Sequence, residues 1–407
     1  MISEKKNKNL LKRIKSQYIL KQVFENLMKT KKLNLIRYNK QIQKIFDFKL
    51  NDYKECNNIL IQDMRSIPEF NSDPKNLKEE INLVDKIGYK NTISSNAFII
   101  FKSFHDKYYL VYGDNSNIII SYDLTTNTKL KQVPKTDEVT SCFNHFPDVY
   151  KKRDLIMTIH SKSKSIKVWD FRDMKLIYHF NKINKSGYLN VACFFNDNNQ
   201  IYILSSNHRY TGKNVEPIKI YDLKGNKIKE LKDSNENVFF LDYYYDKKQF
   251  KKYIIAGFAK YIRAYDPTNN TIYNKYKDKY NAFHREALIN DYESTTKLIE
   301  SSTDGNVRIW DFHKAELIKR IKINERETFG ICLWNKESLF VGTRDKIVLV
   351  NINTGEIIYE YDYTFESKYN DYGIIAIKKL NSIHFGECLV TKAYDKEVIQ
   401  IFSAKNK

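Results

Sequence analysis

Residues able to do metal or thiol chemistry are present in this sequence, but their spacing is poor for it. Cys142 and His145 have the C-x-x-H spacing of half a zinc site, yet no second ligand pair follows at the required distance. The cysteines are odd in number and include no C-x-x-C pair, which favours reduced thiols over a disulfide framework. They are Cys56, Cys142, Cys193, Cys332 and Cys388. We expect no metal, no disulfides, and a buried Cys142 beside a loop histidine.

Catalytic signatures are missing from the sequence as well. It has no phosphate-binding loop, no H-E-x-x-H and no G-x-S-x-G. The run DSNENVFFLDYYYDKK at 233–248 holds carboxylates, but a strand with aromatic packing accounts for them. The eight histidines are dispersed without metal-ligand spacing. We therefore expect a protein that is not an enzyme and uses no cofactor.

The stretch SSTDGNVRIWDF at 301–312 predicts two strands joined by a tight turn at Asp304 and Gly305. Together with its neighbours it forms a unit of four expected strands, at 286–292, 296–302, 307–312 and 315–322. Alternation along a strand places Val307, Ile309 and Asp311 on one face and Arg308 and Trp310 on the other. Asp311 suits the turn into the fourth strand.

This unit recurs along the chain. Copies of its third strand are IIISYDL (118–124), IKVWDF (166–171), IKIYDL (218–223), IRAYDP (262–267), VRIWDF (307–312), IVLVNI (347–352) and IQIFS (399–403). The spacing from copy to copy is 40 to 52 residues, the period of a four-stranded propeller blade.

The pattern resembles the WD-repeat (Trp-Asp repeat) β-propeller family over residues 81–403. Two units keep the literal pair, as Trp169-Asp170 and Trp310-Asp311. The resemblance implies an all-β, seven-bladed propeller. The seventh unit ends after its third strand, so we expect residues 81–89 to complete the last blade and remove an exposed edge.

The family's Gly-His dipeptide is missing, and His284 is the one candidate to replace its histidine. The resemblance then implies a buried hydrogen-bonded tetrad of His284, Ser302, Asp304 and Trp310 in that blade alone. The alternative is a loop histidine exposed to water.

The resemblance also implies a partner-binding face at the turns between second and third strands. The residues at these turns are Lys162, Phe258, Thr303, Arg344 and Lys396. Three are cationic and Phe258 looks exposed, so an acidic or phosphorylated peptide with an apolar anchor is the expected ligand class. The alternative is a set of ordinary solvated loop tips.

The chain has a net charge of +20, and its first 50 residues hold 14 Lys and Arg against three acids, a net +11. Apolar residues at helical spacing predict two short basic helices there. The stretch 16–46 is similar in layout to an F-box, whose apolar positions match Leu20, Val23, Phe24, Leu27, Leu33 and Ile36. Gln17-Tyr18 replaces the usual Leu-Pro, and no Trp stands near its end. A linker at 51–80 follows.

Three functions remain open. An F-box-like segment would make the chain the substrate receptor of a cullin–RING ubiquitin ligase, docked on the ligase adaptor. The second alternative is a general WD-repeat scaffold whose helices pack on the propeller or on another protein. The third is a propeller that contacts RNA or membrane through its basic N-terminus. No apolar run approaches the ~20 residues of a membrane span, and we expect a cytoplasmic protein, with the nucleus as the alternative.

Overall fold

The structure is a computed structural model that describes residues 85–403, with interruptions. The interruptions fall at 89–92, 106, 115–117, 125–127, 134–139, 182, 184–186, 198–199, 209–214, 280–283, 293, 363–372, 383–385 and 394–397. The predicted helical segment, the linker and Lys396 lie outside the described residues. Within those residues every regular element is a strand, and none is a helix that could cross a membrane.

The strands form seven four-stranded antiparallel sheets, which we call blades and number along the chain. Blade 1 is β2 (Ile93–Lys102), β3 (Tyr108–Asp114), β4 (Ile119–Asp123) and β5 (Thr128–Val133). Blade 2 is β6 (Cys142–Asp148), β7 (Arg153–His160), β8 (Ser165–Asp170) and β9 (Lys175–Phe180). Blade 3 is β10 (Tyr188–Asp197), β11 (Gln200–His208), β12 (Lys219–Asp222) and β13 (Lys227–Glu230).

The same order of strands continues through the second half of the chain. Blade 4 is β14 (Val238–Asp246), β15 (Lys251–Phe258), β16 (Ile262–Asp266) and β17 (Thr271–Tyr276). Blade 5 is β18 (His284–Asn290), β19 (Lys297–Ser302), β20 (Asn306–Asp311) and β21 (Leu317–Lys322). Blade 6 is β22 (Thr328–Leu333), β23 (Ser338–Thr343), β24 (Lys346–Asn351) and β25 (Ile357–Asp362).

Blade 7 combines the two ends of the propeller. It consists of β26 (Ile374–Ser382), β27 (Gly386–Ala393), β28 (Val398–Ser403) and β1 (Asp85–Gly88). β1 lies inside the segment 81–89 and pairs antiparallel with β28, from Asp85 opposite Ile401 to Gly88 opposite Val398. The fourth strand of this blade therefore comes from the start of the propeller.

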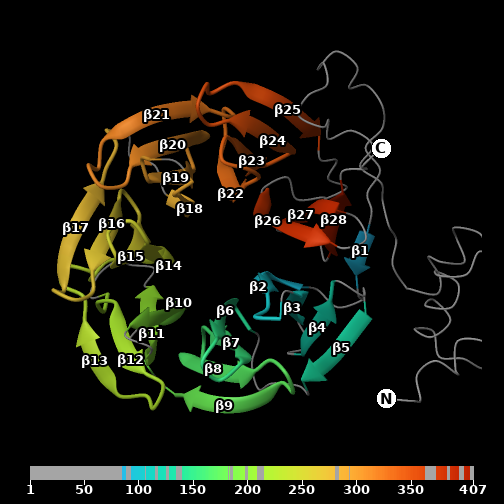
Figure 1. Ribbon diagram of the computed structural model, residues 1–407, viewed down its shortest axis with the longest axis vertical. Coiled ribbons are helices and arrows are strands. Elements are labelled where there is room, and N and C mark those ends of the chain that lie inside the picture. The colour runs from blue at the N-terminus through green and yellow to red at the C-terminus, as the bar shows by residue number, and fades with distance from the viewer. Residues whose placement is uncertain are drawn as a thin grey trace, which may run out of the picture.

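The blades stand in a ring around a central axis (Figure 1). The first strand of each blade contacts the first strands of the blades on both sides, and β26 of blade 7 contacts β2 of blade 1. The molecule is thus an all-β propeller whose innermost strands surround its axis.

Because the blades stack on each other, both faces of the middle strands are buried, and this explains why these strands are rich in apolar residues. In β20, Val307 and Ile309 face one way and Trp310 the other, and all three are at most 3 % exposed. Trp310 packs edge-on against Tyr276 of blade 4, with ring centroids 6.0 Å apart. Trp169 lies likewise in the apolar cluster between blades 1 and 2. The outer strands each pair with only one strand, and most of their residues are exposed or partly buried.

The antiparallel order gives the ring two distinct faces. Face A is defined by the turns between second and third strands, at 161–164, 259–261, 303–305 and 344–345 among the described residues. Face B is defined by the turns between first and second strands, at 149–152, 247–250, 291–296 and 334–337. The connections from blade to blade reach face A, and the turns between third and fourth strands reach face B.

Candidate functional site

The turn residues predicted to bind a partner differ in exposure. Lys162 is exposed on face A, while Thr303 and Arg344 are partly buried. Lys260, in the matching turn of blade 4, is exposed as well. These residues come from blades 2, 4, 5 and 6, so they lie around the ring of face A and do not form one cluster.

The prediction of Phe258 as an exposed anchor is wrong. Its side chain is 0 % exposed, and its ring lies 5.1 Å from that of Tyr261. The guanidinium of Arg263 covers both rings, at 5.3 Å from Phe258 and 4.6 Å from Tyr261. A hydrogen bond of 2.9 Å from Phe258 N to Tyr261 O closes the turn. Phe258 therefore packs beneath the turn and cannot meet a partner.

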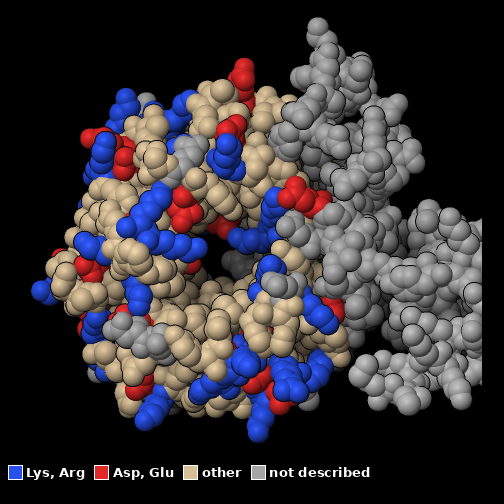
Figure 2. All heavy atoms as spheres, in the orientation of Figure 1, with Lys and Arg blue, Asp and Glu red and all other residues tan. Residues whose placement is uncertain are grey.

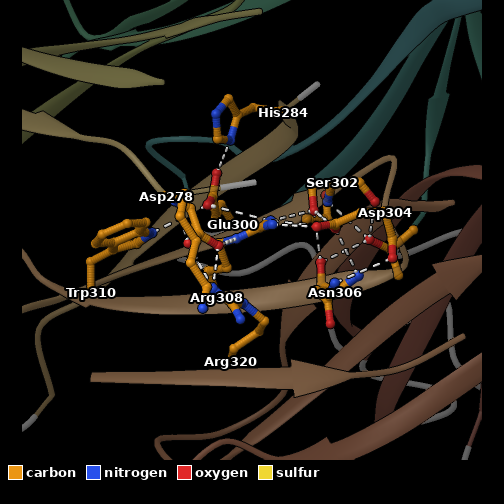
Figure 3. A network of polar contacts seen from close by, with 12 residues as sticks. Asp278, His284, Glu300, Ser302, Asp304, Asn306, Arg308, Trp310 and Arg320 are labelled. Carbon is orange, nitrogen blue, oxygen red and sulfur yellow. Dashed lines mark hydrogen bonds and ion pairs between the residues drawn. The ribbon is translucent and has the colours of Figure 1, made fainter. Parts of the chain in front are cut away.

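A buried ionic network lies below the face A turn of blade 5, with Arg308 at its centre (Figure 3). Arg308 is 0 % exposed and donates through Nε to Asp278 Oδ2 at 2.5 Å. It also donates to Ser302 Oγ at 2.5 Å and forms an ion pair with Asp304. Arg320 donates to Asp278 at 2.6 Å from the outer strand. The network joins the connection before blade 5 to three of its strands.

His284 belongs to this region but not to the predicted tetrad. It is 3 % exposed, so the alternative of a water-exposed loop histidine is wrong. Its Nδ1 contacts Glu300, and Trp310 Nε1 donates to the other carboxylate oxygen of Glu300 at 3.2 Å. Ser302 and Asp304 instead bond each other at 2.5 Å and meet Arg308. The four residues therefore form two separate pairs. Glu300 links His284 to Trp310, and Arg308 contacts Ser302 and Asp304.

Glu300 and Arg308 were not predicted as site residues. They stand opposite each other in the pairing of β19 with β20, where each faces a neighbouring blade. The signal was available in the sequence, since a charged residue at an interior position of a middle strand needs a buried partner.

The hydrogen bonds and charges of this network lower the pKa values of its two aspartates, Asp278 and Asp304. Burial raises the pKa of Asp278, but hydrogen bonds from Arg308 and Arg320 outweigh burial and hold that pKa below its usual value. For Asp304, burial is likewise outweighed by Ser302 and the charge of Arg308, so its pKa is lowered. Both aspartates stay ionised at neutral pH and fix the turn.

The same register of the third strand carries a buried cation in four successive blades. These cations are Lys167, Lys219, Arg263 and Arg308. Lys219 pairs with Glu216 and Arg263 donates to the carbonyl of Asp233. In blade 2, Trp169 Nε1 donates to Thr158 Oγ1 at 3.0 Å, so a hydroxyl takes the place that Glu300 has in blade 5. The blades share a plan and differ in its polar groups.

Polar side chains of the inner strands link blades around the hollow centre seen in Figure 2. Asn144 accepts from Phe194 N at 3.1 Å, and Glu286 accepts from Ile331 N at 2.9 Å. Glu286 also pairs with Lys378 of blade 7 at 2.7 Å. These contacts brace the channel wall, and the described residues include no group of three side chains placed to hold a metal ion.

Cys142 and His145 also have structural partners. His145 lies on strand β6, not in a loop, so that part of the prediction is wrong. It stacks on Phe101 with ring centroids 3.9 Å apart, and its Nε2 lies 2.8 Å from Asp154 Oδ1. Burial raises the pKa of the Cys142 thiol to about 11, so it stays protonated at neutral pH.

Fold and side chains together define a β-propeller with buried polar networks beneath its face A turns, a class that generally serves as a scaffold for protein interactions. No protein-family model matches the chain, and a search of curated proteins finds no match either.

Proposed function

We propose that the chain is a non-catalytic protein-interaction platform of the WD-repeat type and that face A binds its partner. The observation that carries this proposal is the ion pair between Asp304 and the buried Arg308, which holds a turn of that face in place from below. Rigid turns lose little entropy on binding. The matching turns of other blades present Lys162 and Lys260 outward.

The chemistry of face A favours an acidic or phosphorylated segment as the ligand. Cationic side chains recognise carboxylates and phosphates through charge-assisted hydrogen bonds. In the blade 6 turn, the carboxylate of Asp345 accepts a hydrogen bond of 3.2 Å from Thr343 Oγ1 of the same turn. Because Phe258 is buried, it supplies no apolar anchor for this ligand.

Charge reversal tests the use of face A. We expect Lys162→Glu with Arg344→Glu to abolish the recovery of co-purifying partners while the circular dichroism spectrum stays that of the wild type. The matched control is Lys224→Glu with Lys314→Glu, two exposed lysines in turns that reach face B. Equal partner recovery by the two double variants would refute binding at face A.

The finer proposal is that residues 16–46 form an F-box-like segment that docks on the adaptor of a cullin–RING ubiquitin ligase. Its support is the apolar pattern of that stretch and its position before a propeller. A chain without residues 1–50 should lose the adaptor in affinity purification and keep the partner of face A. Retention of the adaptor, or its absence from the full-length sample, would favour the general scaffold.

A further inference from the structure

The most exposed apolar side chains of the described residues lie on face B, opposite the proposed partner face. Val149, Tyr150, Phe250 and Tyr292 are 66, 68, 79 and 72 % exposed. No other large apolar side chain in the described part of the chain exceeds 51 %. All four belong to turns between the first and second strands of blades 2, 4 and 5. Their restriction to one kind of turn sets face B apart from the rest of the surface.

The turns of blades 2 and 4 are built alike. Each places four residues, 149–152 or 247–250, between the last paired residues of its strands. A buried aspartate caps each turn: Asp148 accepts from Lys151 N at 3.2 Å, and Asp246 accepts from Lys248 N at 2.8 Å. The fourth residue has a positive φ in both turns, 49° at Lys152 and 54° at Phe250.

Phe250 is an unfavourable residue at its position for two reasons. A non-glycine residue in the left-handed region is strained, and glycine or asparagine would hold the same turn at less cost. The ring is also left in water, where an apolar side chain gains nothing. Strained and exposed residues held by a rigid turn are characteristic of binding sites.

The exposed charges of the blade 2 and blade 4 turns are cationic, whereas Tyr292 of the blade 5 turn is flanked in the sequence by Asp291 and Glu293. Lys151, Lys152, Lys247 and Lys251 are exposed beside the apolar side chains. The acids of the same turns point inward, since Asp148 is 3 % exposed and bonds Arg153 at 3.1 Å. Asp246 is 0 % exposed and lies 3.3 Å from His313. The two turns thus present lysines and apolar tips to the solvent and keep their carboxylates inside.

The tips are spread along one face of the ring. The turns of blades 4 and 5 touch, with Lys248 Nζ donating to Ser294 O at 3.3 Å. The blade 2 turn is separated from them by the whole of blade 3. Side chains that protrude singly from separate blades match a broad flat surface better than a peptide, which needs a continuous groove.

We propose that face B docks on an anionic lipid bilayer. Aromatic rings favour the level of the lipid headgroups, and lysines beside them are attracted to anionic lipids. Nucleic acid would use the lysines but would not explain a strained phenylalanine and a Val-Tyr pair at the tips. This surface is separate from the basic N-terminal segment and from face A.

A fluorescent reporter tests the contact directly in the full-length chain. The three native tryptophans, Trp169, Trp310 and Trp334, are at most 6 % exposed and should report weakly on the surface. We expect the emission of the variant Phe250→Trp to shift to the blue with vesicles of phosphatidylcholine containing about 30 % phosphatidylserine. Vesicles of phosphatidylcholine alone should produce no shift. The absence of a shift with the anionic vesicles would overturn the proposal, even if the chain sediments with them.

Polyuridylate in solution separates the bilayer from other polyanions. A shift with polyuridylate equal to that with vesicles would assign face B to nucleic acid and overturn the membrane proposal.

Removal of the tips completes the test by vesicle sedimentation. The triple variant Val149→Ser, Tyr150→Ser, Phe250→Ser should lose about tenfold in apparent affinity for the anionic vesicles. Ile228→Ser is the matched control, because Ile228 is 51 % exposed on the outer strand β13. Wild-type affinity in the folded triple variant would move the contact to the N-terminal segment and overturn the proposal.

Discussion

At the scale of single residues, the central feature is a fully buried guanidinium that holds several acids. Arg308 pairs with Asp278 and Asp304, and lies 3.9 Å from Glu300. Replacing a whole buried ionic cluster by apolar residues can be neutral, but removing one partner leaves charges without compensation. The network therefore fixes the local geometry more than it adds stability, and it is sensitive to single substitutions.

Arg308→Met should destabilise the protein by about 3–5 kcal/mol, because buried carboxylates lose their counter-charge. Arg320→Met is the matched control. Its side chain is 27 % exposed and contacts only one of the same acids, so we expect a loss of about 1 kcal/mol. Urea unfolding followed by circular dichroism measures both values. Equal losses would show that burial of the guanidinium does not matter.

The aspartates of the network and of the channel should respond to pH with opposite signs. Asp278 has a lowered pKa, so its stabilisation is present above the unfolded value and is lost as the pH falls through the folded value. The side chain of Asp242 on β14 is exposed, but partial desolvation by the surrounding protein raises its pKa, so stability falls slightly as the pH rises through the window above its ordinary value.

Substitution by asparagine makes this contrast measurable. At about pH 7, Asp278→Asn should lower the Tm clearly and Asp242→Asn should raise it slightly, because Asp242 is exposed, and both changes should shrink at about pH 3. Differential scanning calorimetry at the two pH values measures them. A decrease in Tm for Asp242→Asn at neutral pH would mean that the hydrogen bond it accepts from Tyr243 N, at 2.7 Å, outweighs the partial desolvation of its charge.

At the scale of elements, tight turns determine where strands end and how blades meet. Gly305 has a φ of 75°, and a Cβ there would lie 2.0 Å from Asn324 O in the connection to blade 6. Gly355, with a φ of 85°, has only flexible side-chain atoms nearby, the nearest 3.5 Å away. Gly305 is needed for its positive φ and because a Cβ would not fit, whereas Gly355 is needed for its positive φ alone.

Gly355→Ala should cost about 1–2 kcal/mol, the strain of a left-handed alanine. Gly305→Ala should cost clearly more, because its Cβ would meet two backbone carbonyls that cannot move without opening the blade contact. Chemical denaturation of the two variants gives the comparison. Equal losses would indicate that the Asn324 backbone gives way easily.

The strands of the propeller are easier to predict from the sequence than the contacts between their side chains. The third strands were recognisable because middle strands are buried on both faces, which selects β-branched and aromatic residues such as those of β20. Strand ends are harder to predict: the sequence pattern assigns Ala315 to a strand, but this residue has a φ of 57° and lies in the turn before β21. The partners of Arg308 were missed because Asp278 lies 30 residues earlier, beyond the end of the previous blade. The burial of Phe258 results from the packing of Arg263 and Tyr261 on its ring, which the strand pattern does not reveal.

At the scale of the whole molecule, the two faces of the ring have different surfaces. Face A presents lysines above buried networks, and face B presents exposed apolar tips, which have lysines beside them in blades 2 and 4. The two proposals can hold together, because a bilayer against face B leaves face A open to a partner. This arrangement requires a ring that keeps its shape, which depends on the strand that joins its ends.

Removal of β1 should open the ring. β1 is the fourth strand of blade 7 and pairs with β28 over four residues. Without it, β28 has an unpaired edge and the start of the propeller is no longer tied to its end. A chain that begins at Asn91 should therefore have a markedly lower Tm and an increased tendency to aggregate.

The matched control is a chain that begins at Ile81, which keeps β1 but lacks the basic segment and the linker. Scanning calorimetry and light scattering on the two truncated chains separate ring closure from other effects of truncation. A Tm for the shorter chain equal to that of the longer one would show that β1 does not stabilise the ring. The joined ends would then be a consequence of the fold and not a condition for it.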